Sequence, residues 1–185
     1  MDQPLLKCNG KMSKTKATAK ANFEKTERSV AVNLSLKLVT ELRKICKKAT
    51  VAGSIRQGKD MIGDIDIVVV PNNSDTFYDD VKGMIEYEYG GKKKIFGMFE
   101  ERPVNIFVTS PESFGACLYQ STGPAKYNIQ MRGMAKRKGF KLNEYGLFVR
   151  DTNEKVAGKT EEEIFEAMKM TWKSPNERGK PKKKE

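Results

Sequence analysis

Between residues 30 and 48, apolar side chains recur every three or four positions, the spacing that puts them on one face of an α-helix. These positions are Leu34, Leu38, Val39, Leu42, Ile45 and Cys46. We therefore predict a helix over 30–48 that packs its apolar face on a sheet. Residues 1–28, which precede it, are rich in lysine and lack such periodicity. Their composition predicts a flexible basic arm.

A run of β-branched residues over 65–70 is typical of a buried strand. Asp64 lies directly before this run, and Asp66 is its second residue. Residues two apart on a strand point to the same face, so these two carboxylates should stand side by side while the alternate apolar residues face the other way. A short apolar strand ending near Val51 precedes them, and a polar loop connects the two strands.

The remaining pattern changes character at Ser110. Before it we predict a helix over 75–86, a hairpin or two short strands over 87–99, and a buried strand over 102–108. Beyond it the predicted elements are helices over 111–118, 125–138 and 160–170, with a hairpin over 140–149. This order predicts an α/β (α+β) fold, in which a palm-like mixed β-sheet over 29–110 precedes a small helical C-terminal subdomain with a β-hairpin over 111–178. Residues 179–185 would be a basic tail.

The charge of the chain favours a polyanionic partner. Among 185 residues there are 35 Lys and Arg against 24 Asp and Glu, a formal charge of +11, and phosphates neutralised by such groups release counterions. A purely structural nucleic-acid-binding protein could have the same balance, so charge alone does not indicate catalysis. The chain has no histidine, which excludes histidine-based triads and histidine-ligated zinc and leaves acid–base and metal chemistry to carboxylates.

Cysteine usage and hydropathy indicate the compartment. Cys8, Cys46 and Cys117 are odd in number and far apart, which matches neither a disulfide framework nor a zinc site and predicts a reducing, intracellular location. No run approaches the ~18 apolar residues of a membrane span, and the N-terminus lacks the apolar run of a signal peptide. We therefore expect no membrane association.

The stretch from Gly53 to Asp66 carries the candidate chemistry. Two adjacent carboxylates repel each other unless a cation lies between them, and Mg²⁺ is commonly held by one or two carboxylates together with substrate phosphates. Upstream, Gly53 and Ser54 offer close backbone approach and a hydroxyl to a phosphate, and Arg56 adds charge-assisted hydrogen bonds. An isolated Asp-x-Asp pair is more often part of a hairpin turn, but the Gly-Ser pair before it favours a nucleotidyl-transfer site.

These residues resemble the nucleotidyltransferase superfamily through Gly-Ser, a basic loop and Gly63-Asp64-Ile65-Asp66. Downstream sequence motifs resemble family X DNA polymerases, the polymerase β group. They occur in the same order as in that family, over about residues 30–178. They are Lys94-Ile95-Phe96-Gly97, Thr122-Gly123 with Tyr127-Asn128 and Arg132, Gly139 to Phe148, Glu161 to Phe165, and Trp172 to Arg178. A palm with only a C-terminal subdomain is the plan of the minimal viral members of this family.

The resemblance implies template-directed addition of nucleotides to a DNA 3′ end, such as short-gap filling in repair, by a two-metal route with two Mg²⁺ (or Mn²⁺) ions. It implies that Asp64, Asp66 and Asn105 hold the metals and carry catalysis. The nucleotide would be bound by Gly53, Ser54, Arg56, Gly63, Tyr119, Thr122, Gly123 and Asn128, and DNA by Lys126, Arg132, Lys136 and Arg137. The implied partners are gapped or primer–template DNA and deoxynucleoside triphosphates, with ribonucleotides as a further option, and the chain would act as a monomer. Glu144 would support closing of the site.

Departures from the family pattern lead to further hypotheses. Asn105 stands where the family has its third metal carboxylate, which predicts impaired chemistry with nucleotide binding retained. Gln57 follows Arg56 where the family has a second arginine. Ser121 precedes Thr122 where the family has an aromatic residue, which predicts weak discrimination against ribonucleotides. We also predict a cis Gly123–Pro124 bond. A catalytically inactive DNA-end-binding protein and a nucleotidyltransferase with a different acceptor remain as alternatives.

Overall fold

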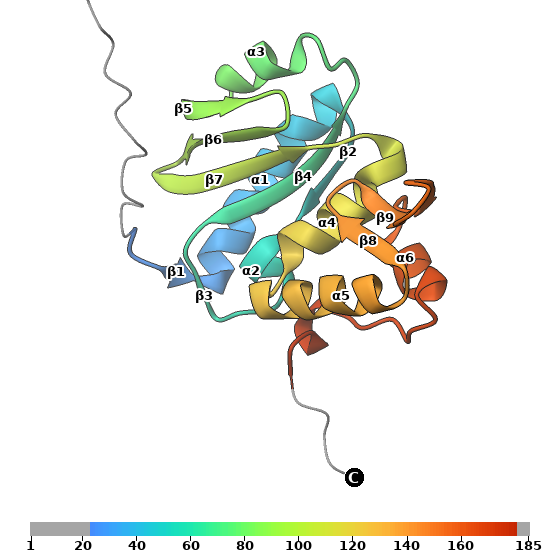
Figure 1. Cartoon of the computed structure of the whole chain (residues 1–185). Helices are drawn as coiled ribbons and strands as arrows, with labels where there is room; N and C mark the ends of the chain where they lie inside the picture. Colours follow the sequence, from blue (N-terminus) through green and yellow to red (C-terminus); the bar gives the residue numbers. More distant parts are fainter. Residues whose placement is uncertain (1–22, 181–185) are drawn as a thin grey trace, which may run out of the picture.

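A computed structural model of the chain, which describes residues 23–180, is built around a five-stranded sheet (Figure 1). The strands are β2 Cys46–Val51, β4 Ile65–Pro71, β5 Glu86–Gly91, β6 Lys94–Phe99 and β7 Arg102–Val108, in the spatial order β2-β4-β7-β6-β5. Only β4 and β7 pair in parallel; the other three pairings are antiparallel. The mixed sheet predicted from the sequence is thus confirmed, and all five strands lie within 29–110.

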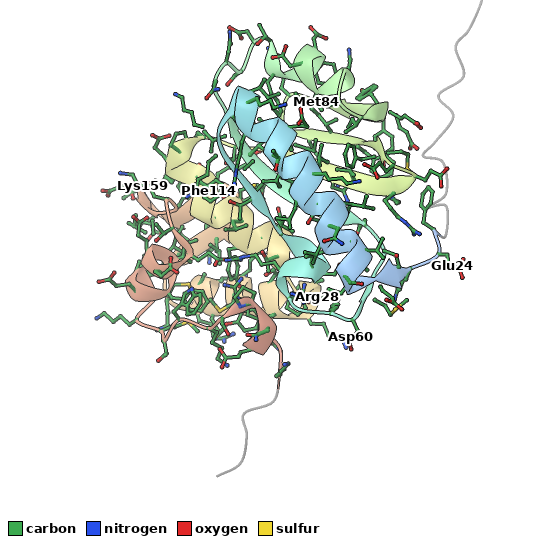
Figure 2. All side chains as sticks on the ribbon, turned by 180° about the vertical axis from the view of Figure 1, so that it is seen from behind. Glu24, Arg28, Asp60, Met84, Phe114 and Lys159 are labelled. Atoms are coloured by element: carbon green, nitrogen blue, oxygen red, sulfur yellow. The ribbon has the colours of Figure 1, made fainter. Side chains whose placement is uncertain are left out.

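Helix α1 (Arg28–Ile45) covers one face of this sheet, as the view from behind shows (Figure 2). The alternation along β4 explains the packing, because Ile65, Ile67 and Val69 face the same core as Leu38 and Leu42 of α1. The short helix α3 (Phe77–Lys82) closes the end of this core. The predicted contact between an apolar helix face and a sheet is therefore present.

Two predicted helices of the palm have different bounds in the structure. The first was expected to run to Lys48, but it ends at Ile45, and Cys46 already belongs to β2 with extended backbone angles. Pairing with β4 outweighs the helical spacing here, since Cys46 and Ala49 are buried in the core from the strand. The helix predicted over 75–86 is limited to Phe77–Lys82 and ends at Gly83.

The opposite face of the sheet is partly covered by α4 (Phe114–Thr122), which starts after the 3₁₀ turn Pro111–Ser113. Phe114, Cys117 and Leu118 of α4 pack on Val68 and Val70 of β4. The rest of the C-terminal subdomain comprises α5 (Ala125–Arg137), β8 (Phe140–Asn143), β9 (Gly146–Val149), β10 (Lys155–Ala157), α6 (Glu161–Ala167) and the 3₁₀ turn Pro175–Glu177. It has a core of its own and contains the predicted hairpin, formed by β8 and β9.

Three smaller features complete the fold. The one-turn helix α2 (Gly53–Arg56) occupies part of the predicted loop, and β1 (Thr26–Glu27) pairs with β3 (Met61–Ile62), so the arm predicted over 1–28 is structured at its C-terminal end. Residues 1–22 of that arm and 181–185 of the predicted tail lie outside the described residues. The Gly123–Pro124 bond is cis, which confirms that prediction. Within residues 23–180, no helix is long and apolar enough to cross a membrane.

Candidate active site

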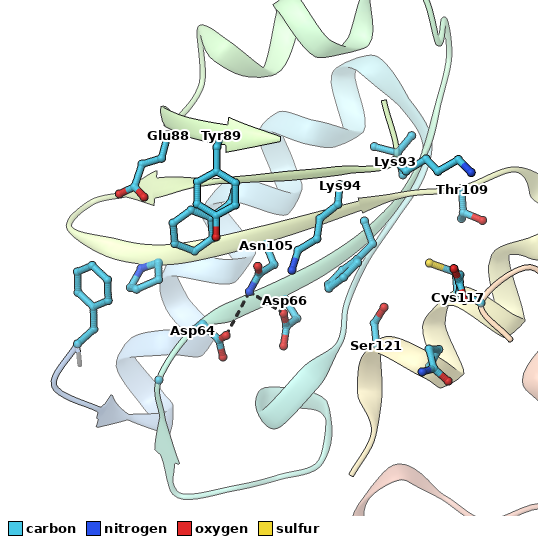
Figure 3. Close-up of a pocket in the computed structure, with 18 of the residues that line it drawn as sticks. Asp64, Asp66, Glu88, Tyr89, Lys93, Lys94, Asn105, Thr109, Cys117 and Ser121 are labelled. Carbon is cyan, nitrogen blue, oxygen red and sulfur yellow. Dashed lines mark hydrogen bonds between the residues drawn. The ribbon is translucent and has the colours of Figure 1, made fainter. Parts of the chain in front are cut away.

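Three side chains predicted to hold metal meet on the sheet face that α4 leaves open (Figure 3). The parallel register of β4 and β7 places Asp66 opposite Asn105, and Asp64 lies two residues before Asp66 on the same side. The Asn105 amide Nδ2 donates hydrogen bonds to Asp64 Oδ2 at 3.1 Å and to Asp66 Oδ1 at 3.0 Å. The predicted cluster is therefore formed, with an amide nitrogen between two carboxylates.

The chemistry of this cluster follows from the asparagine. Its amide hydrogens carry partial positive charge and offset the repulsion between Asp64 and Asp66, as a cation would. Turning the amide about its terminal torsion exchanges its nitrogen for a carbonyl oxygen that can ligate a hard cation. Two carboxylates and a carbonyl oxygen fit Mg²⁺ or Mn²⁺. Within residues 23–180 no group of three His, Cys, Asp or Glu residues could hold a metal. The cluster here is not such a group, because its third member is an amide.

Gly53 lies against the Asp66 carboxylate, and Ser54 follows it in α2. Gly53 has φ of +56°, and a Cβ there would overlap Asp66 Oδ2, so both backbone and space require glycine. The Ala52 amide donates to the Asp66 carbonyl at 2.7 Å and fixes α2 on β4. Among the described residues none donates to or accepts from Ser54 Oγ, although that atom is buried. Buried polar groups usually have a partner, and a phosphate oxygen would supply one.

A cleft with a volume of about 1120 Å³ opens above the cluster. Its palm wall includes Gly63 and the metal-binding candidates, and its opposite wall comes from the C-terminal subdomain through Gln120, Ser121 and Tyr145. Small-molecule sites typically have volumes of about 300–1000 Å³, so this cleft can hold a nucleotide with room for part of a strand.

Arg56 was expected at the phosphates but makes a different contact. Its Nη1 and Nη2 donate to Glu161 Oε1 and Oε2 at 2.8 and 2.7 Å, and Nη1 also donates to Thr122 Oγ1 at 2.9 Å. Arg178 Nη1 donates to Glu161 Oε1 at 2.9 Å, and Gln57 Nε2 donates to the Thr122 carbonyl. Arg56 and Thr122 thus join the palm to the C-terminal subdomain.

The Glu161 carboxyl is only 3% exposed. Burial alone would raise its pKa, but hydrogen bonds and charge from Arg56 and Arg178 outweigh burial and lower the pKa below its ordinary value. Sequence reasoning missed this Arg56–Glu161–Arg178 brace. Its members are far apart in the chain, and Glu161 was recognised only as part of a family-like stretch in a predicted helix, which Thr160 and Glu163 cap.

Tyr119 was expected to line the sugar but is fully buried in the C-terminal core. It packs against Tyr127 and Phe165, and the Arg178 guanidinium lies 5.1 Å from its ring centroid. The reason is helix phase: α4 extends to Thr122, so Tyr119 falls on its inner face while Gln120 and Ser121 reach the cleft. Thr122 and Gly123 are also buried behind this wall.

The candidates on α5 separate into two groups. Asn128 is 4% exposed, and its Nδ2 donates to the Gln120 carbonyl at 2.8 Å, so it positions the residue that lines the cleft. Arg132, one helical turn along α5 from Asn128, is exposed. Lys126, Lys136 and Arg137 are also exposed. Their contact with DNA remains a prediction.

One contact that the sequence did not predict borders the cleft. Lys93, just before β6, donates from Nζ to the Tyr145 hydroxyl at 2.9 Å, which connects the palm to the turn between β8 and β9. Glu144 in the same turn lines the cleft. Cys117 lies in the cleft wall, and burial raises its pKa to about 11, so its thiol is protonated at neutral pH and not nucleophilic.

Comparisons with known proteins agree with this geometry. The family model described as DNA polymerase beta thumb matches residues 117–179. The "Repair DNA polymerase X" of a Malawi isolate of African swine fever virus is 30% identical over 155 residues, which cover 75% of this chain and 86% of the relative. That of a Kenya isolate is 30% identical over 149 residues, with the same coverage. The crystal structure of Leishmania infantum polymerase beta in a ternary P/T complex shares the fold, with a TM-score of 0.74 at 20% identity over 85% of this chain and 77% of that one.

Proposed function

Because this chain belongs to the family X DNA polymerases, we propose that it adds nucleotides to the 3′ end of a primer strand, opposite a template, in gapped or primer–template DNA. The observation that carries the proposal is the cluster of Asp64, Asp66 and Asn105, with Gly53 of the Gly-Ser pair packed against Asp66. The cluster places metal ligands in a cleft of nucleotide size, and the adjoining Gly-Ser turn would supply the phosphate contact that phosphoryl transfer also needs.

Each residue has a stated role in this proposal. Asp64, Asp66 and the Asn105 carbonyl oxygen would hold two Mg²⁺ or Mn²⁺ ions, which when bound stabilise the attacking and leaving oxygens of the displacement. Ser54 and the glycine backbone at Gly53 bind the phosphates at the end of the triphosphate. Gln120 and Ser121 lie along the opposite wall, where they border the sugar and base of the incoming nucleotide.

Asn105 limits the chemistry. A neutral amide can neither accept the proton of the primer hydroxyl nor add negative charge to the metal site. Loss of a positioned general base costs about 10²- to 10⁴-fold in rate. We therefore propose that the protein binds nucleotide and DNA but transfers nucleotides slowly.

Charge and relatives support DNA as the partner. The chain carries a formal charge of +11, and a second Leishmania infantum polymerase beta structure similar in fold is a ternary gap complex. The bridging amide of Asn105 favours a second candidate, a DNA-end-binding protein without activity, because two carboxylates already joined by hydrogen bonds need no metal to stay together. A nucleotidyltransferase with another acceptor would leave the charge unexplained.

Incubation with a one-nucleotide gapped duplex, Mg²⁺ or Mn²⁺ and each labelled nucleotide in turn tests the proposal. We expect slow incorporation of the nucleotide that pairs with the template base, its loss in Asp66→Asn, and no effect of Asp75→Asn, which removes an exposed carboxylate elsewhere. DNA binding without incorporation, even by Asn105→Asp, would favour the inactive DNA-end-binding protein. Incorporation of labelled nucleotides that does not depend on the template base would favour a nucleotidyltransferase with a different acceptor.

A further inference from the structure

A row of side chains leads away from the carboxylates across the palm sheet. The strand register pairs Asp66 of β4 with Asn105 of β7, Asn105 with Phe96 of β6, and Phe96 with Tyr89 of β5. Neighbouring strands are about 4.8 Å apart, so Phe96 lies about 10 Å and Tyr89 about 14 Å from Asp66 along this row. All four positions belong to the sheet face that carries the candidate active site.

A β-bulge puts Tyr89 on this face. Tyr87 pairs with Gly97 and Tyr89 with Phe96, so two steps along β5 correspond to one step along β6, and Glu88 is the extra residue. In a regular strand Tyr87 and Tyr89 would point the same way. Here Tyr87 points to the opposite side, where its ring packs against Tyr78, while Tyr89 reaches the cleft.

Tyr89 and Phe96 form a stacked pair with an open outer surface. Their ring centroids are 4.8 Å apart with 25° between the ring planes. Tyr89 is 58% exposed and Phe96 is half-buried, and both line the cleft. We call this pair the aromatic platform. Exposure of large aromatic side chains adds little stability to the free protein, whereas an exposed aromatic face can stack on a flat ligand.

A cation lies beside this row of side chains, near the carboxylates. Lys94 on β6 is exposed, its Nζ lies 4.9 Å from the ring centroid of Phe107, and Figure 3 shows its side chain directed toward Asn105 and Asp66. A lysine beside stacked aromatic rings is the combination with which proteins bind single-stranded nucleic acid, the cation at the backbone and the rings under the bases. Glu88 at the outer rim disfavours a phosphate there, so the rings themselves should meet bases.

We propose that the aromatic platform stacks on an unpaired base near the 3′ end of a DNA strand whose terminus lies at the carboxylates but is not paired with a template. The proposal rests on the proposed function for the position of that terminus. Nucleotides of one strand are spaced about 3.4 Å along a helix axis, so the base about three positions from a 3′ end at Asp66 reaches Phe96. Lys94 then lies beside the intervening backbone. Bases in a continuous duplex are covered by their neighbours. The ligand class is therefore DNA with a single-stranded or frayed 3′ end.

Quenching of 2-aminopurine, which loses fluorescence when it stacks, tests the proposal. The probe is a single-stranded oligonucleotide that carries 2-aminopurine three positions from its 3′ end, titrated with protein without nucleotide or metal. We expect Tyr89→Ala to weaken binding about 5- to 100-fold and to abolish most quenching, because one stacked base contributes that much. Tyr89→Phe keeps the ring and should behave like the native protein.

Two controls separate stacking from other effects. Trp172→Ala removes another exposed aromatic residue, 39% exposed and outside the cleft lining, and should change neither affinity nor quenching. A fully paired blunt duplex should bind native protein and Tyr89→Ala equally. Native affinity and quenching in Tyr89→Ala, or an equal loss with blunt duplex, would overturn the proposal. If Tyr89→Ala fills gaps at the native rate and quenches 2-aminopurine as the native protein does, the platform proposal alone is refuted. If the native protein quenches 2-aminopurine but incorporates no nucleotide, only the proposed polymerase function is refuted.

Discussion

Replacing Glu161 with glutamine should destabilise the folded chain by about 3 kcal/mol. Glu161 is 3% exposed, and its two oxygens accept hydrogen bonds from Arg56 and Arg178, whose side chains are 21% and 0% exposed. Removing one partner of a buried ion pair costs about 3 to 5 kcal/mol, because the remaining charge is left without compensation. Glutamine keeps the shape and one acceptor oxygen, and Arg56 retains some water, so we expect the lower end of this range.

Urea unfolding at pH 7 measures this effect through the midpoint and the slope of the transition. The pH dependence has a definite sign. The pKa of Glu161 is lowered in the folded state, so its stabilising contribution is present above the ordinary value of 4.5 and is lost as pH falls through the folded pKa. The native protein and Glu161→Gln should therefore differ most near neutral pH and converge in acid.

The neighbouring Glu162→Gln is a matched control, because Glu162 is exposed in the same first turn of α6. It should leave stability within about 0.5 kcal/mol of the native value. Equal stability of Glu161→Gln and native protein, or a difference that does not change between pH 7 and pH 3, would show that the Arg56–Glu161–Arg178 brace does not join the two parts of the molecule energetically.

Three further predictions concern metal, DNA and nucleotide. Without divalent ions, Asn105→Asp should lower the melting temperature, because it replaces two hydrogen bonds with a third nearby carboxylate. Added Mg²⁺ should then raise the melting temperature of Asn105→Asp more than that of the native protein. An equal rise in the two proteins would argue against metal at this cluster. On a plot of log affinity for gapped DNA against log salt concentration, the slope should be about −0.9 for each phosphate contact. Arg132→Gln should make this slope shallower by about the value of one contact. A flat salt dependence would contradict a basic DNA-binding surface on α5. Ribo- and deoxyribonucleotides should be inserted at similar single-turnover rates because Ser121 leaves space in the cleft wall, whereas a thousandfold preference for the deoxy form would show that another group excludes the 2′-hydroxyl.

Local patterns in the sequence were enough to place part of the site. The shared face of Asp64 and Asp66 follows from the two-residue period of a strand, and the structure confirms it. Asn105 is 41 residues from Asp64 and 39 from Asp66, and only the parallel register of β4 and β7 brings it there. That pairing is not a local property, so the position of Asn105 was predicted from family resemblance alone.

Non-local contacts account for most of what the sequence did not predict. Arg56 meets Glu161 across 105 residues, so a basic residue in a candidate phosphate loop could not be recognised as part of a brace. Tyr119 was assigned to the nucleotide from the family resemblance alone, and the continuation of α4 to Thr122 places it on the inner face of the helix. The bulge at Glu88 depends on the pairing of β5 with β6, and nothing in the sequence of β5 alone indicates it.

Single-turnover insertion into a one-nucleotide gap, measured side by side for native protein and Asn105→Asp, tests the central claim most directly. The claim is that Asp64, Asp66 and residue 105 form the centre where a DNA 3′ end is extended. We expect the maximal rate with the template-complementary nucleotide to rise at least about a hundredfold in Asn105→Asp, with the nucleotide concentration for half-maximal rate nearly unchanged. Equal maximal rates for the two proteins would mean that the third metal ligand lies elsewhere and that this cluster is not the catalytic centre.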